Sequence, residues 1–164
     1  MKSYAIKLLA DNSIQIIQCK GDPEQFMPFH IETSGAGTDE DPIVETKVLD
    51  AELIGELPKD EETGQYIYPE REFRASWRKS GASSIAVNLT AARAEKMDKL
   101  RAIRDELLKA TDEEYVKLLS QGADLTDIQA RKQELRDMPD TRQAELDAIS
   151  DVEELKNYVP AELA

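Results

Sequence analysis

The sequence is poor in the residues that most enzymes and metalloproteins use for their chemistry. Its 164 residues include one cysteine, Cys19, and one histidine, His30. A single cysteine cannot form an internal disulfide, which favours a reducing compartment. One Cys and one His are also too few for a Cys/His zinc cluster or a two-histidine metal motif. We therefore expect no metal, no cofactor and no catalytic residue, with Cys19 in the core and His30 packed or on the surface.

Positive charge and long apolar runs are also scarce. Lys and Arg number 21 against 34 Asp and Glu, which gives a formal net charge of −13. A field of that sign repels phosphate backbones and anionic lipid headgroups, so we expect neither nucleic acid nor membrane as a partner. No apolar run approaches the roughly 20 residues of a bilayer span. Because Lys7 interrupts the short apolar stretch at the start, a secretory signal is not expected either.

The character of the sequence changes near residue 89. Six of the seven glycines, five of the seven prolines and seven of the nine aromatic residues precede it. Ala, Leu, Glu, Lys and Arg, which favour helices, dominate the second half. The chain therefore predicts an α+β fold. Residues 1–89 are expected to form a β-rich region with a hairpin or small antiparallel sheet and long loops, and residues 90–164 a helical hairpin or small antiparallel bundle.

Alternating apolar residues predict the strands of the first half. Runs at 3–9 and 13–19 flank Ala10-Asp11-Asn12, a sequence typical of a tight turn, and so predict a hairpin. An apolar segment at 25–31 is expected to pack on that hairpin. The alternation at 84–89 predicts a further strand.

Two segments between these strands are harder to assign. Residues 32–65 contain eleven acidic residues and six Gly or Pro, which predicts mainly loop, with a weak strand pattern at 43–48. Residues 66–79 leave helix and strand both open, because Phe73 and Trp77 have helical spacing but follow an X-Pro bond.

The second half has helical periodicity from the predicted N-cap Asn88 onward. Thr111 begins a Thr-x-x-Glu capping box, so the first helix either breaks there or continues to Gln121. Its apolar stripe consists of Met97, Leu100, Ile103, Leu107 and Leu108.

Further helices are predicted after Gly122. A second capping box predicts a helix at 126–136 that Pro139 ends. Shorter helices follow at 141–149 and, with Ser150 as N-cap, at 151–158.

One local cluster combines aromatic and basic side chains. It contains Phe73 and Trp77 together with the basic residues Arg71, Arg74, Arg78 and Lys79. Trp and Arg are enriched at the energetic centres of protein interfaces, so the cluster is a candidate partner-binding patch. The favoured alternative makes Phe73 and Trp77 core residues where the two halves meet, with the arginines paired to neighbouring glutamates.

The second half resembles small tail-associated proteins of double-stranded DNA phages, including the phage tail assembly chaperone-like group. The resemblance rests on three segments that occur in this order: Phe73-Arg74-Ala75-Ser76-Trp77-Arg78, Leu100-Arg101-Ala102-Ile103-Arg104-Asp105-Glu106-Leu107-Leu108 and Arg131-Lys132-Gln133-Glu134-Leu135-Arg136-Asp137-Met138-Pro139.

The resemblance implies a non-enzymatic protein that serves tail or tail-fibre assembly through contacts with a phage tail or tail-fibre protein. It would act in the host cytoplasm during assembly. The alternative is a structural component of the virion tail, baseplate or fibre that forms homo-oligomers through its helices. Candidate binding residues in the helical motifs are Arg101, Arg104, Arg131 and Arg136. With Asp105 and Asp137, these arginines are also expected to form ion pairs along the rim of a helical hairpin, with the leucines buried between the helices.

Overall fold

A computed structural model describes residues 1–163 and confirms the predicted α+β class. The chain divides into two units, Met1–Asn88 and the part from Leu89 onward. The division expected from the sequence, between residues 89 and 90, lies one residue further along the chain. No helix in the described residues is long and apolar enough to cross a bilayer.

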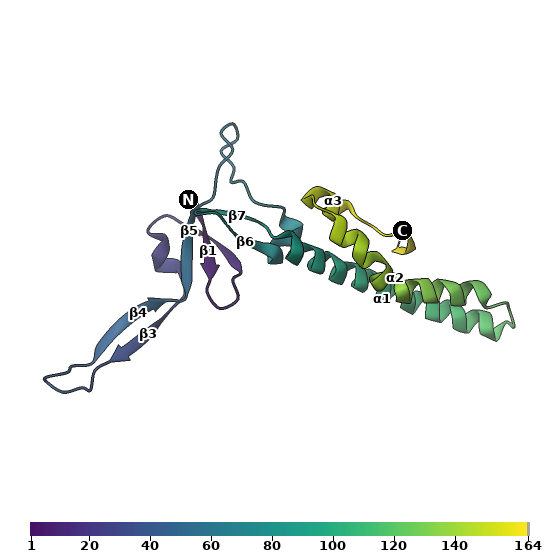
Figure 1. The fold of residues 1–164 in the computed structure, drawn as a ribbon, viewed down its shortest axis with the longest axis horizontal. Coiled ribbons are helices and arrows are strands. Elements are labelled where there is room, and N and C mark those ends of the chain that lie inside the picture. Colours follow the sequence, from purple (N-terminus) through teal and green to yellow (C-terminus); the bar gives the residue numbers. More distant parts are fainter. Residues whose placement is uncertain (164) are drawn as a thin grey trace. The chain divides into compact units, whose positions relative to one another are not determined.

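Antiparallel strands build the first unit (Figure 1). Within the described residues there are seven: β1 (Lys2–Leu8), β2 (Ile14–Cys19), β3 (Phe29–Ser34), β4 (Val44–Leu49), β5 (Ala51–Glu56), β6 (Trp77–Ser80) and β7 (Ser84–Val87). One sheet has the order β2-β1-β5, while β3-β4 and β6-β7 are two-stranded ribbons.

The predicted N-terminal hairpin is present as β1 and β2. Their register places Lys7 opposite Ile14, and Asn12 in the turn has a φ of 62°. Asn adopts this left-handed conformation more readily than most residues, which is why the sequence could predict the turn. Cys19 is buried at the end of β2, as expected.

Most of residues 32–65 lie outside strands, as predicted, but the prediction missed β5, which completes the central sheet. Ala51 and Ile54 on β5 are buried, although two glutamates interrupt the apolar pattern. One of them, Glu52, forms ion pairs with Lys7, at 3.3 Å, and with Lys79. These ion pairs offset the low strand preference of glutamate. Lys7 and Lys79 are far from Glu52 in the sequence, so no local pattern could indicate the ion pairs. The weak strand pattern at 43–48 does correspond to β4.

The apolar segment at 25–31 packs on the sheet through one residue only. Met27 is 3% exposed and lies in a cluster with Ile6 and Ala51. Phe29 and Ile31 instead belong to β3 and are about half exposed. They lie in the β3-β4 ribbon, which extends away from the central sheet (Figure 1).

The ambiguous segment 66–79 contains both structures. A 3₁₀ helix spans Arg71–Ser76 and β6 follows it directly. Phe73 interrupts the 3₁₀ helix with non-helical dihedral angles and is fully buried. The helical spacing of Phe73 and Trp77 therefore reflects a short 3₁₀ helix and not an amphipathic α-helix.

Two antiparallel helices build most of the second unit (Figure 1). Its elements are α1 (Leu89–Ser120), α2 (Thr126–Ala148), α3 (Val152–Asn157) and a 3₁₀ turn (Ala161–Leu163). No break occurs at Thr111, because this residue is buried and its hydroxyl donates to the Leu107 carbonyl at 2.6 Å. Gly122, with a φ of 64°, follows the end of α1.

The prediction that Pro139 ends the second helix is wrong, since α2 runs through it and includes 141–148. Proline removes one intrahelical hydrogen bond and crowds the preceding turn. Leu135, Met138 and Leu146 are each at most 1% exposed, so the same face is buried on both sides of Pro139. Packing of that face supplies most of the helical stability and outweighs the local penalty.

Helix caps differ from the predicted ones by one or two residues. At the start of α2, the Asp124 carboxylate accepts from the Thr126 amide at 3.0 Å and the Thr126 hydroxyl at 2.7 Å. At the start of α3, the cap is Asp151 and not Ser150. Its carboxylate accepts from the Glu153 and Glu154 amides, both at 2.9 Å.

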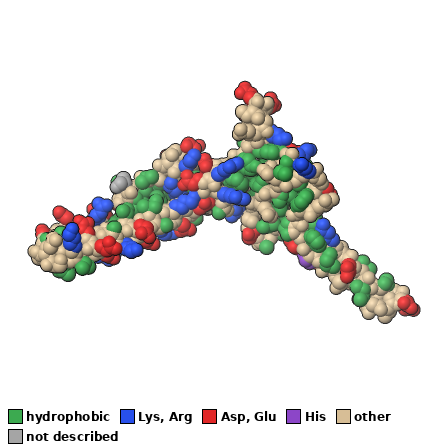
Figure 2. All heavy atoms as spheres, turned by 180° about the vertical axis from the view of Figure 1, so that it is seen from behind, with side chains coloured by type: hydrophobic (Ala, Val, Ile, Leu, Met, Phe, Trp, Pro, Cys, Tyr) green, Lys and Arg blue, Asp and Glu red, His purple; other side chains and the backbone are tan. Residues whose placement is uncertain are grey.

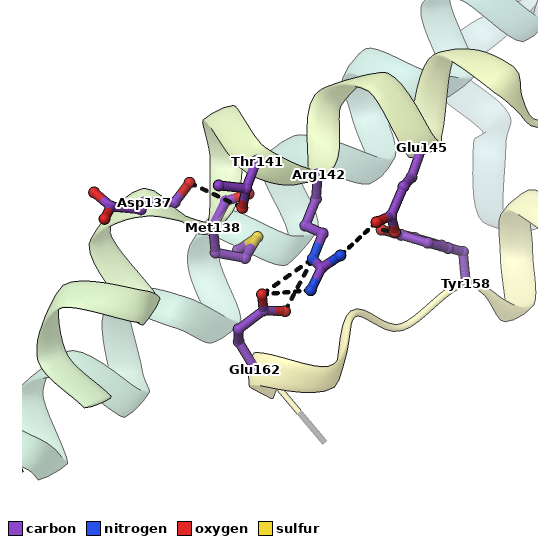
Figure 3. A network of polar contacts seen from close by, with 7 residues as sticks. All are labelled: Asp137, Met138, Thr141, Arg142, Glu145, Tyr158 and Glu162. Carbon is purple, nitrogen blue, oxygen red and sulfur yellow. Dashed lines mark hydrogen bonds and ion pairs between the residues drawn. The ribbon is translucent and has the colours of Figure 1, made fainter. Parts of the chain in front are cut away.

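A polar network attaches the end of the chain to α2 (Figure 3). Arg142 donates to both carboxylate oxygens of Glu162, at 2.7–3.1 Å, and pairs with Glu145. The Tyr158 hydroxyl donates to Glu145 at 2.8 Å. Burial and this hydrogen bond raise the pKa of Tyr158 to about 12. Two carboxylates around one guanidinium raise the pKa of Arg142 and so keep it charged.

Candidate functional site

The aromatic members of the predicted patch belong to the core of the first unit. Trp77 is 2% exposed and Phe73 is fully buried. The indole N–H of Trp77 donates to the Glu70 carbonyl at 3.0 Å, and its ring stacks with Tyr68 at a centroid distance of 6.4 Å. Trp77 packs with Ile54 and neighbouring apolar residues. Phe73 and Trp77 are therefore core residues, as the favoured interpretation of the cluster predicted, and they do not form the exposed patch of the other interpretation.

The basic members of this cluster separate into two kinds. Arg78 is half-buried and donates to the carbonyls of Ala75, at 2.8 Å, and Trp77, at 2.7 Å. The sequence predicts a glutamate partner for Arg78, but the side chain instead satisfies these two backbone carbonyls. Arg74 is exposed and, like Arg71, forms no ion pair within the described part of the chain.

A hollow of about 370 Å³ opens beside these two arginines. The Arg71 guanidinium lies over the Tyr68 ring, 4.4 Å from its centroid. One edge of Trp77 reaches the hollow from the core. The full lining is Ile16, Gln18, Tyr68, Arg71, Arg74 and Trp77.

The arginines of the helical motifs do not form the expected rim of ion pairs between helices. Arg101 pairs with Asp98 at 2.9 Å and Arg104 with Asp105 at 2.7 Å, in both cases on α1 itself. Arg136 is exposed on α2. The observed pair between the helices is Lys132 with Asp112, at 2.5 Å, and Lys132 also lies over the Tyr115 ring.

The leucines of the motifs are buried to different degrees. Leu135 is 1% exposed, but Leu107 and Leu108 are only half-buried. Ile103, placed in the buried stripe by its spacing, is 48% exposed. Helical spacing identified the face, but not where along α1 a second helix covers it.

A groove of about 490 Å³ lies between α1 and α2, in the part of the hairpin nearest their connection. Arg131 is the one predicted binding residue that lines it. Its apolar wall consists of Leu107, Ala110, Leu118 and Ile128, and its polar lining of Thr111, Glu114, Asp124, Asp127 and Arg131. Hydrogen bonds from Thr126 lower the pKa of Asp124, so this carboxylate is ionised at neutral pH.

Nearly all residues of the β3-β4 ribbon are exposed, and Figure 2 shows hydrophobic side chains along one side of it. Apolar residues are exposed along it, and its turn carries Asp39, Glu40 and Asp41. Gly35 is required in this turn, because a Cβ there would approach the Pro42 carbonyl oxygen to 2.1 Å. The exposed apolar residues are Phe29, Ile31, Ile43 and Val44.

His30 lies on the surface of this ribbon, which is one of the two positions expected for it. Its Nδ1 lies 2.6 Å from Asp50 and its Nε2 3.1 Å from Glu32. These carboxylates raise the pKa of His30. Both ring nitrogens face acids, so the arrangement favours the imidazolium ion and offers no nucleophile to activate.

The described residues contain no group of three or more His, Cys, Asp or Glu side chains arranged to hold a metal ion. The hollow and the groove are two candidate binding sites, because they are lined by residues of the aromatic-basic cluster and of the helical motifs. Sequence reasoning found Arg71, Arg74, Trp77 and Arg131. It missed Tyr68, which lies three residues before Arg71, and Ile16 and Gln18 of β2, which only the fold brings to the same place.

Comparison with protein-family models, curated proteins and solved structures found no match for this chain. The resemblance to phage tail proteins remains a prediction from the sequence motifs.

Proposed function

We propose that the chain is a non-enzymatic assembly factor that binds a phage tail or tail-fibre protein through its helical unit. The proposal combines the motif resemblance with one structural observation, the groove between α1 and α2. The two helical motifs lie on antiparallel helices, and residues from both, Leu107 and Arg131, line the groove.

The lining of the groove indicates the kind of segment it takes. Leu107, Leu118 and Ile128 offer an apolar wall for one or two side chains. A volume of about 490 Å³ is within the range of pockets that hold small ligands or anchoring side chains. Three carboxylates against one arginine favour a client segment with apolar anchors and basic flanks.

The acidic charge fits this role. A net charge of −13 keeps a protein with exposed apolar side chains soluble and repels the phage DNA present in the same cytoplasm. Exposed apolar residues on α1 include Ile103, Val116 and Leu119.

Co-expression with the tail-fibre protein of the same phage tests the proposal. The chain is expected to co-purify with the fibre protein and to raise its soluble yield. Ala110→Trp fills the groove and is expected to weaken the complex at least about tenfold, which is the typical effect of removing contacts at the energetic centre of an interface. Ala102→Trp is the matched control, because Ala102 is also exposed on α1 but does not line the groove.

Mass spectrometry of purified virions separates this function from the structural alternative. An assembly factor is expected to be absent from finished particles, whereas stoichiometric presence would assign the chain to the virion. Equal binding by both tryptophan variants would refute the groove as the docking site.

A further inference from the structure

We infer that the hollow beside β2 is a second binding site, which takes an acidic peptide segment of a partner protein. It lies entirely within the first unit and is independent of the helical groove and of the tail-assembly role. Three properties of the hollow support this assignment: its unpaired arginines, its aromatic wall and its size.

The arginines supply the recognition of a carboxylate. Arg71 and Arg74 are exposed, line the same hollow, and form no ion pair within residues 1–163. Because neither guanidinium is engaged in an ion pair with a described residue, both can bind a carboxylate from a partner. A guanidinium binds carboxylates through two parallel hydrogen bonds, which gives both affinity and direction.

The wall of the hollow holds Arg71 in place. Tyr68 lies under the Arg71 guanidinium and stacks in turn with Trp77, whose indole is fixed by the bond to the Glu70 carbonyl. An arginine held on an aromatic ring loses less side-chain freedom when it binds a ligand. Gln18 adds an amide at the same site.

Size and charge select a peptide over a nucleic acid. A hollow of about 370 Å³ admits one or two side chains, and the half-buried Ile16 and Tyr68 provide an apolar surface beside the arginines. This combination suits an Asp or Glu next to an apolar residue. A polyanion meets the same two arginines but also the repulsion of a chain with a net charge of −13.

Isothermal titration calorimetry of the full chain tests this inference with a capped Gly-Glu-Leu-Glu-Gly peptide as the probe. We expect binding that weakens with added salt, and the peptide with Gln in place of Glu is expected to bind at least about tenfold more weakly. Arg71→Gln and Arg74→Gln are each expected to weaken the binding of the acidic peptide about tenfold. Lys109→Gln removes one positive charge from an exposed position on α1, outside the hollow, and is expected to leave affinity unchanged.

Several outcomes would overturn the inference. Peptide binding that survives both hollow variants, or that falls equally in Lys109→Gln, would show that the hollow is not the site. Tighter binding of a twelve-nucleotide oligothymidine, or equal competition by inorganic phosphate, would show a general anion site in place of a peptide site. Because both arginines are exposed, circular dichroism is expected to show unchanged thermal unfolding, and loss of folding in both variants would also contradict the assignment.

Discussion

Replacement of Trp77 by alanine is expected to destabilise the first unit strongly, and not only to weaken binding. Trp77 is 2% exposed and packs with Ile54, Leu57 and the ring of Tyr68. Truncation of a buried Trp to Ala costs about 3–5 kcal/mol through lost burial and the cavity left behind. The variant also leaves the Glu70 carbonyl without the indole donor.

The size of this loss is large relative to the stability of a small domain. Domains are stable by about 5–15 kcal/mol in total. For a domain of 60–100 residues, each kcal/mol corresponds to about 4–8 °C in Tm. Trp77→Ala is therefore expected to lower the Tm of the first unit by at least about 12 °C.

Hydrogen exchange read by mass spectrometry measures this effect, because it reports each strand separately. In Trp77→Ala, the amides of β1, β2 and β5 are expected to exchange much faster than in the unaltered chain. Arg74→Ala is the control and is expected to leave these rates unchanged, since Arg74 is exposed. Unchanged exchange in Trp77→Ala would refute the assignment of Trp77 to the core.

The charged networks make two predictions about pH. Hydrogen bonds from Tyr158 and Arg142 lower the pKa of Glu145, and those from Arg142 lower that of Glu162. Their stabilisation is therefore present above the ordinary carboxyl pKa and is lost as the pH falls through the lowered folded values, so acidification is expected to accelerate hydrogen exchange near Glu162. Arg142→Met is expected to reduce that dependence, because only the Tyr158–Glu145 hydrogen bond remains, and an unchanged dependence would contradict the network. For His30, whose folded pKa is raised, the stabilisation is complete below its ordinary pKa of 6.5 and is lost as the pH rises through the folded value. NMR titration is expected to give a midpoint above 6.5, and a midpoint at or below 6.5 would refute the contacts of His30.

Local signals in the sequence were sufficient for the parts of the fold that local physics determines. Asn12 in a short turn between apolar runs identified the β1-β2 hairpin. Apolar spacing and helix-forming residues identified α1. In both cases the deciding interactions lie within one element or one turn.

Long-range contacts decide the features that sequence reasoning missed. Glu52 is tolerated in β5 because Lys7 and Lys79 lie next to it in the folded chain. Pro139 is tolerated in α2 because Leu135 and Leu146 bury the same helical face on both sides of it. Neither compensation leaves a pattern near the residue itself.

The candidate sites were predictable only in part for the same reason. Arg74 and Trp77 stood out as an aromatic-basic cluster, but their spacing could not show that Trp77 faces the core and Arg74 faces solvent. The hollow also needs Ile16 from β2, more than fifty residues earlier in the chain. Likewise, Arg131 reaches the groove while Arg136, on the same helix, does not line it.

Hydrogen exchange on the purified complex with the tail-fibre protein tests the proposed docking role of the helical unit most directly. We expect slower exchange in the complex at residues 107–118 of α1 and 124–131 of α2, which carry the groove. Failure of the two proteins to form a complex, or protection that excludes both segments, would contradict that role.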